Sequence, residues 1–302
     1  MTKRKILPSS VVPTSPLWVT GRALLARRGI DFFSHWNWTR DTLDMENIND
    51  LRVVSRRFRE CLLLFGPCFR QEDLSHILRK LKQLTRRLVI LRNIHESLVF
   101  MEQLTGELSS TADKKRSPLQ EYLRQESKRQ ARQLDRLLGK VQKQTLSTRF
   151  WEFCYSPTLF GQSGLDPFMP AHRYVRETVY LSLGETSAMA AAARNESDLD
   201  AQKRWRTTVK KLRYRLEVVT PVVTTPLEDE LELLGSYRDL LEELHDLDRH
   251  RDLVEAWIKD IPSAKELTEI IATKRSGAWR RLETLMKELP WERLVKKIGD
   301  SL

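Results

Sequence analysis

The chain has 302 residues, of which 40% are hydrophobic and 31% are charged, and its formal net charge is +11. This length and composition indicate a globular chain with one large domain or two smaller ones. The positive charge favours an anionic partner but leaves nucleic acid, an anionic membrane surface and a phosphate polymer open. No apolar run approaches the roughly 18 residues of a membrane span, so the sequence predicts none.

Helical periodicity recurs along nearly the whole chain. After a basic segment, residues 1–15, which we interpret as a flexible tail, apolar residues recur every three or four positions, as on the buried face of an amphipathic helix. We expect helices over residues 16–33, 47–65, 74–91, 119–153, 172–194, 199–219, 227–259 and 263–289. Breaks rich in glycine, proline or polar residues are expected at 66–67, 105–118, 155–170, 221–226 and 261–262. Because no alternating strand pattern is present, the sequence predicts an all-α fold.

An internal repeat organises these helices. A shift of 154 residues places the segment 49–59 on the segment 203–213, and the breaker Pro67 on Pro221. The shift also matches the apolar positions of the two segments, which are Leu51, Phe58 and Leu62 in the first and Trp205, Leu212 and Leu216 in the second. With one residue of drift, the leucines of the next helix match as well. We therefore expect a single domain, residues 16–302, built from two similar halves of about 16–154 and 155–302.

Each repeat segment carries a stripe of basic residues on one helix face. The spacing of three and four keeps these side chains within about 60° of one another, and no acidic residue is interleaved on that face. The stripes are Arg52, Arg56 and Arg59 in the first segment, and Lys203, Arg206, Lys210 and Arg213 in the second. Either water or an anion must face so many cations, because a dry interior would leave them unpaired. A solvated face with snorkelling side chains is one reading, and a phosphate site is the other, since arginine matches phosphate oxygens in a bidentate way.

Signatures of catalysis and metal binding are missing from the sequence. The six histidines form no HExxH motif, and no glycine-rich phosphate loop is present. The ligand-type residues His245, Asp246 and Asp248 point in different directions on a helix, so we interpret them as packing and hydrogen-bonding groups. The three cysteines have no ligand spacing, which favours packing roles in a reduced, cytoplasmic setting. We expect neither enzymatic activity nor a cofactor or metal.

The two basic segments resemble the paired signatures of the CHAD family, the conserved histidine α-helical domains. The resemblance rests on DLRVVSRRFR at residues 50–59 and VKKLRY at residues 209–214, with RRLVILRN at residues 86–93 similar to the family's next helix. It covers the chain from about residue 16. The resemblance implies two four-helix halves related by a pseudo-twofold axis, with a basic groove or pore between them.

The resemblance also implies a ligand and partners. Members bind inorganic polyphosphate, associate with polyphosphate granules and often accompany CYTH-type triphosphate hydrolases, so granule proteins and such hydrolases are expected partners. No CYTH-type β-tunnel is encoded here. Carried over by position, the polyphosphate ligands are the seven stripe residues, together with Arg57, Lys211 and Arg86.

One departure from the family pattern concerns pH. The histidines that name the family precede the stripe arginines by three residues, and here those positions hold Asn49 and Lys203. We therefore expect binding to depend little on pH between 5.5 and 8, because no histidine of the proposed site titrates there. Two alternatives to polyphosphate binding are open: an RNA- or DNA-binding protein, which the scattered tryptophans disfavour, and an enzyme acting on phosphate chains.

Overall fold

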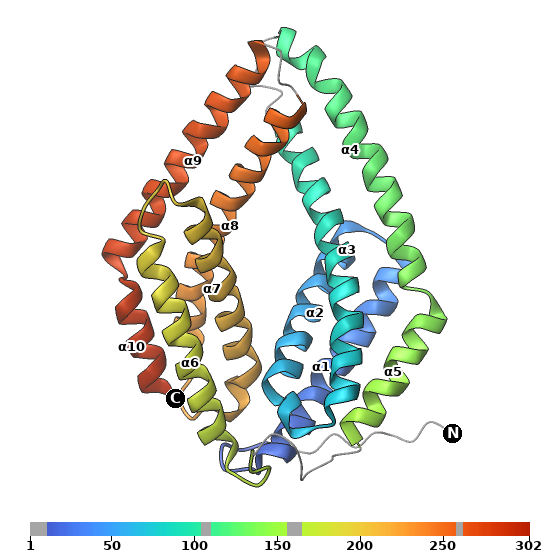
Figure 1. Cartoon of the computed structure of the whole chain (residues 1–302), viewed down its shortest axis with the longest axis vertical. Helices are drawn as coiled ribbons and strands as arrows, with labels where there is room; N and C mark the ends of the chain where they lie inside the picture. The colour runs from blue at the N-terminus through green and yellow to red at the C-terminus, as the bar shows by residue number, and fades with distance from the viewer. Residues whose placement is uncertain (1–10, 104–109, 156–164, 258–261) are drawn as a thin grey trace.

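The computed structural model describes residues 11–103, 110–155, 165–257 and 262–302, and these residues fold into ten α-helices (Figure 1). In the N-terminal half they are α1 (Leu17–Thr42), α2 (Met45–Phe65), α3 (Gln71–Gln103), α4 (Ser110–Leu137) and α5 (Lys140–Tyr155). In the C-terminal half they are α6 (Ala171–Ala192), α7 (Leu199–Val219), α8 (Glu228–Trp257), α9 (Pro262–Glu288) and α10 (Trp291–Ser301). The predicted all-α fold is confirmed for this part of the chain.

The structure has five helices in each half of the chain where the sequence predicted four. The expected helix 119–153 is two helices, because α4 ends at Leu137 and α5 starts at Lys140, with Gly139 between them. A short amphipathic helix, α10, follows Pro290 and was missed. The first helix also continues past residue 33 to Thr42, through polar residues of modest helix propensity. The helix α4 starts at Ser110, inside the stretch expected to be a break.

The two helices that carry the basic segments have the bounds that the repeat predicts. Both α2 and α7 have 21 residues, and their starts differ by 154 positions. Each follows an aspartate N-cap whose side chain accepts a backbone hydrogen bond, Asp44 from Asn47 and Asp198 from Ala201. Each runs into a three-residue 3₁₀ turn that contains a proline, at residues 66–68 and 220–222.

The helices of the two halves lie on opposite sides of the molecule, and α2 packs against α7 in the middle (Figure 1). At one end, α4 contacts α9. Near the starts of the two halves, the Leu17 amide donates to the Met169 carbonyl at 2.9 Å, and the His172 amide donates to the Pro13 carbonyl at 3.0 Å. Of the predicted tail, residues 1–10 lie outside the described residues, whereas residues 11–15 run beside the start of α6.

The apolar face of each basic helix is buried, as the repeat pattern predicted. Leu51 and Phe58 on α2, and Trp205 and Leu212 on α7, have no exposed surface. Burial of such side chains stabilises the fold by about 1.5–3 kcal/mol each. Because the apolar residues fix the rotation of each helix, the basic residues must lie on the remaining faces, near the α2–α7 boundary.

No described helix is long and apolar enough to span a membrane.

Candidate anion-binding site

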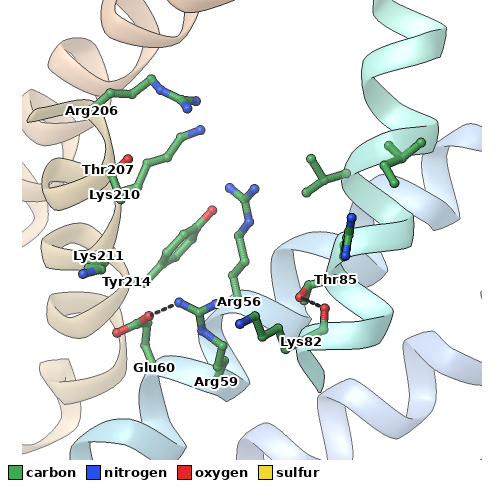
Figure 2. A pocket seen from close by; sticks show the side chains of 13 residues that line it. Arg56, Arg59, Glu60, Lys82, Thr85, Arg206, Thr207, Lys210, Lys211 and Tyr214 are labelled. Carbon is green, nitrogen blue, oxygen red and sulfur yellow. Dashed lines mark hydrogen bonds and ion pairs between the residues drawn. The ribbon is translucent and has the colours of Figure 1, made fainter. Parts of the chain in front are cut away.

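A pocket of about 420 Å³ lies where α2, α3 and α7 meet (Figure 2). Its lining combines cationic side chains with a small apolar wall from Val89, Ile90 and Tyr214. Figure 2 shows Arg206, Lys210 and Tyr214 projecting into it from one side, with Arg56 rising from below. Seven cations line the pocket: Arg56, Arg59, Lys82, Arg86, Arg206, Lys210 and Lys211. Glu60 is the one acidic side chain among the lining residues described.

The pocket brings together six of the ten residues that the sequence analysis predicted as polyphosphate ligands. They come from all three helices and are Arg56, Arg59, Arg86, Arg206, Lys210 and Lys211. Lys82 precedes Arg86 by four residues on α3 and lies on the same helix face, but from the sequence we interpreted it as an ordinary surface charge. That spacing was visible in the sequence, but a single pair of cations on one helix does not distinguish a site from an ordinary surface.

Four pocket cations have no carboxylate partner among the described residues. They are Arg56 on α2, Lys82 and Arg86 on α3, and Lys211 on α7. Four like charges around one volume repel one another, so they cost stability unless water or a bound anion compensates them. The arrangement favours a ligand with several negative charges that contacts three helices at once.

Two other pocket cations are held by a carboxylate from a fourth helix. Arg206 donates from Nη1 to Glu242 Oε2 at 2.6 Å, and the Lys210 ammonium donates to the same oxygen. Glu242 lies on α8, and its other oxygen accepts from Arg92 Nη1 at 3.2 Å. All four side chains are at least four-fifths buried. The stripe on α7 is therefore partly neutralised, which the sequence did not predict because Glu242 lies 32 residues beyond Lys210.

Three further candidate arginines, Arg57, Arg59 and Arg213, take part in ion pairs near the α2–α7 boundary. Glu217 on α7 pairs with Arg57 of α2 at 2.5 Å and with Arg213 at 3.3 Å. Glu60 on α2 pairs with Arg59 at 3.4 Å and with Arg215 of α7 at 3.7 Å. Each helix thus supplies one carboxylate to the other's arginine. Arg57 and Arg213 do not line the pocket, so the structure gives them a place in the interface between the helices.

Two candidate residues from the sequence, Arg52 and Lys203, do not line the pocket. Arg52 donates from Nε and Nη2 to Asn49 Oδ1, at 3.2 and 2.7 Å, so the residue at the family's histidine position orients this arginine. Burial, with the nearby charges of Arg56 and Arg92, lowers the pKa of Arg52 to about 10, which leaves it charged at neutral pH. Lys203, at the second histidine position, is exposed near the start of α7.

Above the pocket, ion pairs connect α3 to α8. Arg92 on α3 pairs with Glu242 and with Asp246 of α8, at 3.2 and 3.5 Å. In the opposite direction, Arg249 on α8 pairs with Glu96 of α3 at 3.6 Å and donates to the Asn93 carbonyl at 2.8 Å. Since α2 packs against α3 and α7, and α7 against α8, the four helices form a closed circuit of contacts.

Two histidines of α8, His245 and His250, are neutral at neutral pH. Burial, with the positive charge of Arg206, lowers the pKa of His245 to about 4, although Glu242 opposes the effect. Burial, with the charge of Arg249, lowers the pKa of His250 to about 3, and its ring stacks on Phe100 at 4.1 Å between centroids. His245, Asp246 and Asp248 therefore serve packing and ion pairing. No group of three or more potential metal ligands occurs within the described ranges.

Four tryptophans lie in the core and the described pocket lining contains none, whereas Trp38 is 54% exposed. Trp205 and Trp291 lie edge to face with their ring centroids 5.5 Å apart, and both pack on Tyr237. Trp36 and Trp279 are also buried. The pocket as described has one aromatic side chain, Tyr214, which is 8% exposed.

Comparison with known proteins identifies the family of this fold. No curated protein matches the sequence. The crystal structure of the CHAD domain from the plant Ricinus communis is similar at a TM-score of 0.62 and 17% identity, over 96% of this chain and 93% of that one. PptA from Streptomyces chartreusis is similar at a TM-score of 0.65 and 14% identity, over 93% of this chain and 100% of that one. The CHAD domain family model matches residues 23–255, which is most of the chain, and the protein therefore belongs to the CHAD family.

Proposed function

We propose that this protein binds inorganic polyphosphate, without catalysing a reaction on it, in the pocket between α2, α3 and α7. The observation that carries the proposal is the set of four unpaired cations around one volume, Arg56, Lys82, Arg86 and Lys211. Polyphosphate presents about one negative charge per phosphate and no apolar group, so charge at suitable spacing is enough to hold it. Each arginine guanidinium can donate two parallel hydrogen bonds to phosphate oxygens, and each lysine adds a positive charge.

The paired cations support the same ligand. Arg206 and Lys210 lie at the pocket wall with their charged ends near Glu242, so an anion in the pocket can reach them. Together with the four unpaired cations, they give up to six contacts to successive phosphates. By analogy with single-stranded nucleic acids, log K should fall with log salt at about 0.7 per phosphate contact made by a free cation.

A competition titration tests the ligand. Purified protein is titrated with long-chain polyphosphate at physiological salt, with single-stranded RNA added at equal phosphate concentration. Tight binding that RNA does not displace supports the proposal, because the pocket lacks a series of exposed aromatic side chains on which bases would stack. Equal or tighter binding of RNA would replace polyphosphate with nucleic acid as the ligand. Release of phosphate with added Mg²⁺ or Mn²⁺ would contradict the non-catalytic part of the proposal.

We expect the affinity for polyphosphate to fall about tenfold as the pH rises from 6 to 8. Burial lowers the pKa of Lys210 to about 7, although Glu242 opposes the effect. Lys210 is therefore mostly an ammonium at pH 6 and mostly neutral at pH 8, and an anion binds the charged form. This expectation differs from the pH independence expected from the sequence, in which only histidines were considered, and the measurement decides between the two. Affinities of the wild type and of Lys210→Gln are measured across this range, and a flat wild-type profile, or an equal slope in the variant, would contradict the assignment.

In the cell, we propose that polymer binding places the protein at polyphosphate granules in the cytoplasm, with granule proteins or CYTH-type triphosphate hydrolases as partners. A fluorescent fusion should colocalise with granules and become diffuse when Arg56 and Arg86 are both replaced. Granule localisation that survives this change would show that a protein partner, and not the polymer, recruits it.

A further inference from the structure

Glu242 does not line the pocket, but it pairs with two of the cations that do. Its Oε2 accepts from both Arg206 and Lys210, and its side chain is 16% exposed. Although burial alone would raise the pKa of Glu242, Lys210 and Arg206 lower it well below the usual range. The carboxylate is therefore ionised at neutral pH. It takes one N–H donor of Arg206 and one of Lys210 that a phosphate oxygen would otherwise use, and it offsets their positive charge.

The second oxygen of Glu242 has a partner of its own. Oε1 accepts from Arg92 Nη1 at 3.2 Å, and Arg92 does not line the pocket. If Arg206 and Lys210 bind another anion, Glu242 therefore still has the positive charge of Arg92 beside it. An exchange of partners avoids the large cost of a buried carboxylate without a cation.

We propose that Glu242 is a built-in competitor of the bound anion, which lowers the affinity of the pocket for phosphate chains by holding Arg206 and Lys210 in the empty site. The inference rests on the proposed function. Apart from Arg59, which pairs with Glu60, the pocket then contains two classes of cation. The four unpaired cations attract the polymer, and the two paired ones engage only when a phosphate replaces the carboxylate. A ligand with few charges gains little from the second class, so Glu242 favours long polyanions over single phosphates.

The opposing reading is that Glu242 positions the two cations for the ligand. The substitution Glu242→Gln separates the readings, because an amide oxygen still accepts a hydrogen bond but carries no charge. If Glu242 competes, the variant binds long-chain polyphosphate about tenfold more tightly or better. Its salt dependence should also steepen by about 0.7 to 1.4 in log K against log salt, because Arg206 and Lys210 are then free to neutralise phosphates and release the counterions condensed on the polymer. If Glu242 instead positions Arg206 and Lys210 for the ligand, the affinity of the variant for polyphosphate falls or stays the same.

Glu243→Gln is the matched control. Glu243 is the next residue on α8 and pairs with Arg281 at 2.5 Å, and its side chain is 41% exposed. The substitution makes the same change in net charge outside the pocket, so a general electrostatic effect would appear equally in both variants. Circular dichroism establishes that both variants are folded. Should Glu242→Gln not fold, Glu242→Asp withdraws the carboxylate by one methylene, and it should also bind more tightly than the wild type.

Each outcome separates this inference from the proposed function. Tighter binding and a steeper salt slope in Glu242→Gln but not in Glu243→Gln support it. Wild-type binding of polyphosphate with no gain, or with a loss, in Glu242→Gln overturns the competitor role and leaves the proposed function standing. An equal gain in both variants also overturns it. Absence of polyphosphate binding in the wild type and in the variants overturns both.

Discussion

The double substitution Arg56→Gln and Arg86→Gln should lower the affinity for long-chain polyphosphate at least about 100-fold. Both arginines line the pocket from different helices, and neither has a carboxylate partner among the described residues. Each lost charge-assisted hydrogen-bonding group costs about 1.5–3 kcal/mol, so two cost about 3–6 kcal/mol, and 1.4 kcal/mol is about tenfold. The salt slope should decrease by about 1.4, since two phosphate contacts are lost. Isothermal titration at several salt concentrations measures both quantities.

The matched control replaces two exposed arginines outside the pocket. Arg79 on α3 and Arg204 on α7 lie on the same helices as pocket residues but do not line the pocket. Arg79→Gln with Arg204→Gln makes the same change in net charge and should change affinity less than about threefold, by weakening long-range attraction alone. Equal losses in the two double variants would mean that the polymer responds to total charge and that the pocket is not the site.

The substitution Arg92→Met should destabilise the fold by about 3 kcal/mol. Arg92 is 17% exposed and pairs with Glu96, Glu242 and Asp246, so its removal leaves buried carboxylates with fewer counter-charges. Methionine retains most of the packing of the arginine stem, which isolates the loss of charge. Urea unfolding followed by circular dichroism gives the free energy of unfolding. Arg238→Met is the control, because Arg238 pairs with the exposed Asp239, and a change within about 0.5 kcal/mol is expected.

The pH dependence of this destabilisation identifies its cause. Burial raises the pKa of Glu96, the neighbouring Asp246 adds to the rise, and Arg92 opposes it. Without Arg92 the pKa of Glu96 rises further above its unfolded value, so the folded variant binds a proton more readily than the unfolded chain. The variant should therefore recover stability relative to the wild type as the pH falls from 7 to 5. A destabilisation that is constant over this range would point to lost packing instead.

The sequence was sufficient to predict the two helices, α2 and α7, that carry the basic segments. The spacing of Arg52, Arg56 and Arg59 and the repeat at 154 residues are local patterns, and burial of Phe58 and Leu212 then decides which face remains for the cations. The all-α fold followed from the same periodicity. The break at Gly139, inside the expected helix 119–153, and the short helix after Pro290 were missed.

The distribution of counter-charges could not be predicted from local patterns. Glu217 follows Arg213 by one turn, so that pair was visible in the sequence, but its contact with Arg57 depends on how α2 packs against α7. Glu242 is distant in sequence from both Arg206 and Lys210, and only the packing of α8 on α7 brings them together. Tertiary contacts therefore decide which members of a basic stripe are free to hold a ligand.

Lysine footprinting tests most directly whether polyphosphate occupies this pocket. The protein is acetylated at limiting reagent with and without long-chain polyphosphate, and modification is quantified at each lysine by mass spectrometry. Lys82 and Lys211 line the pocket without a carboxylate partner, whereas Lys128 and Lys296 are exposed on other helices and serve as internal controls. The pocket assignment predicts strong protection of Lys82 and Lys211 and unchanged modification of Lys128 and Lys296. Equal protection of all four, or protection of the controls alone, would contradict it.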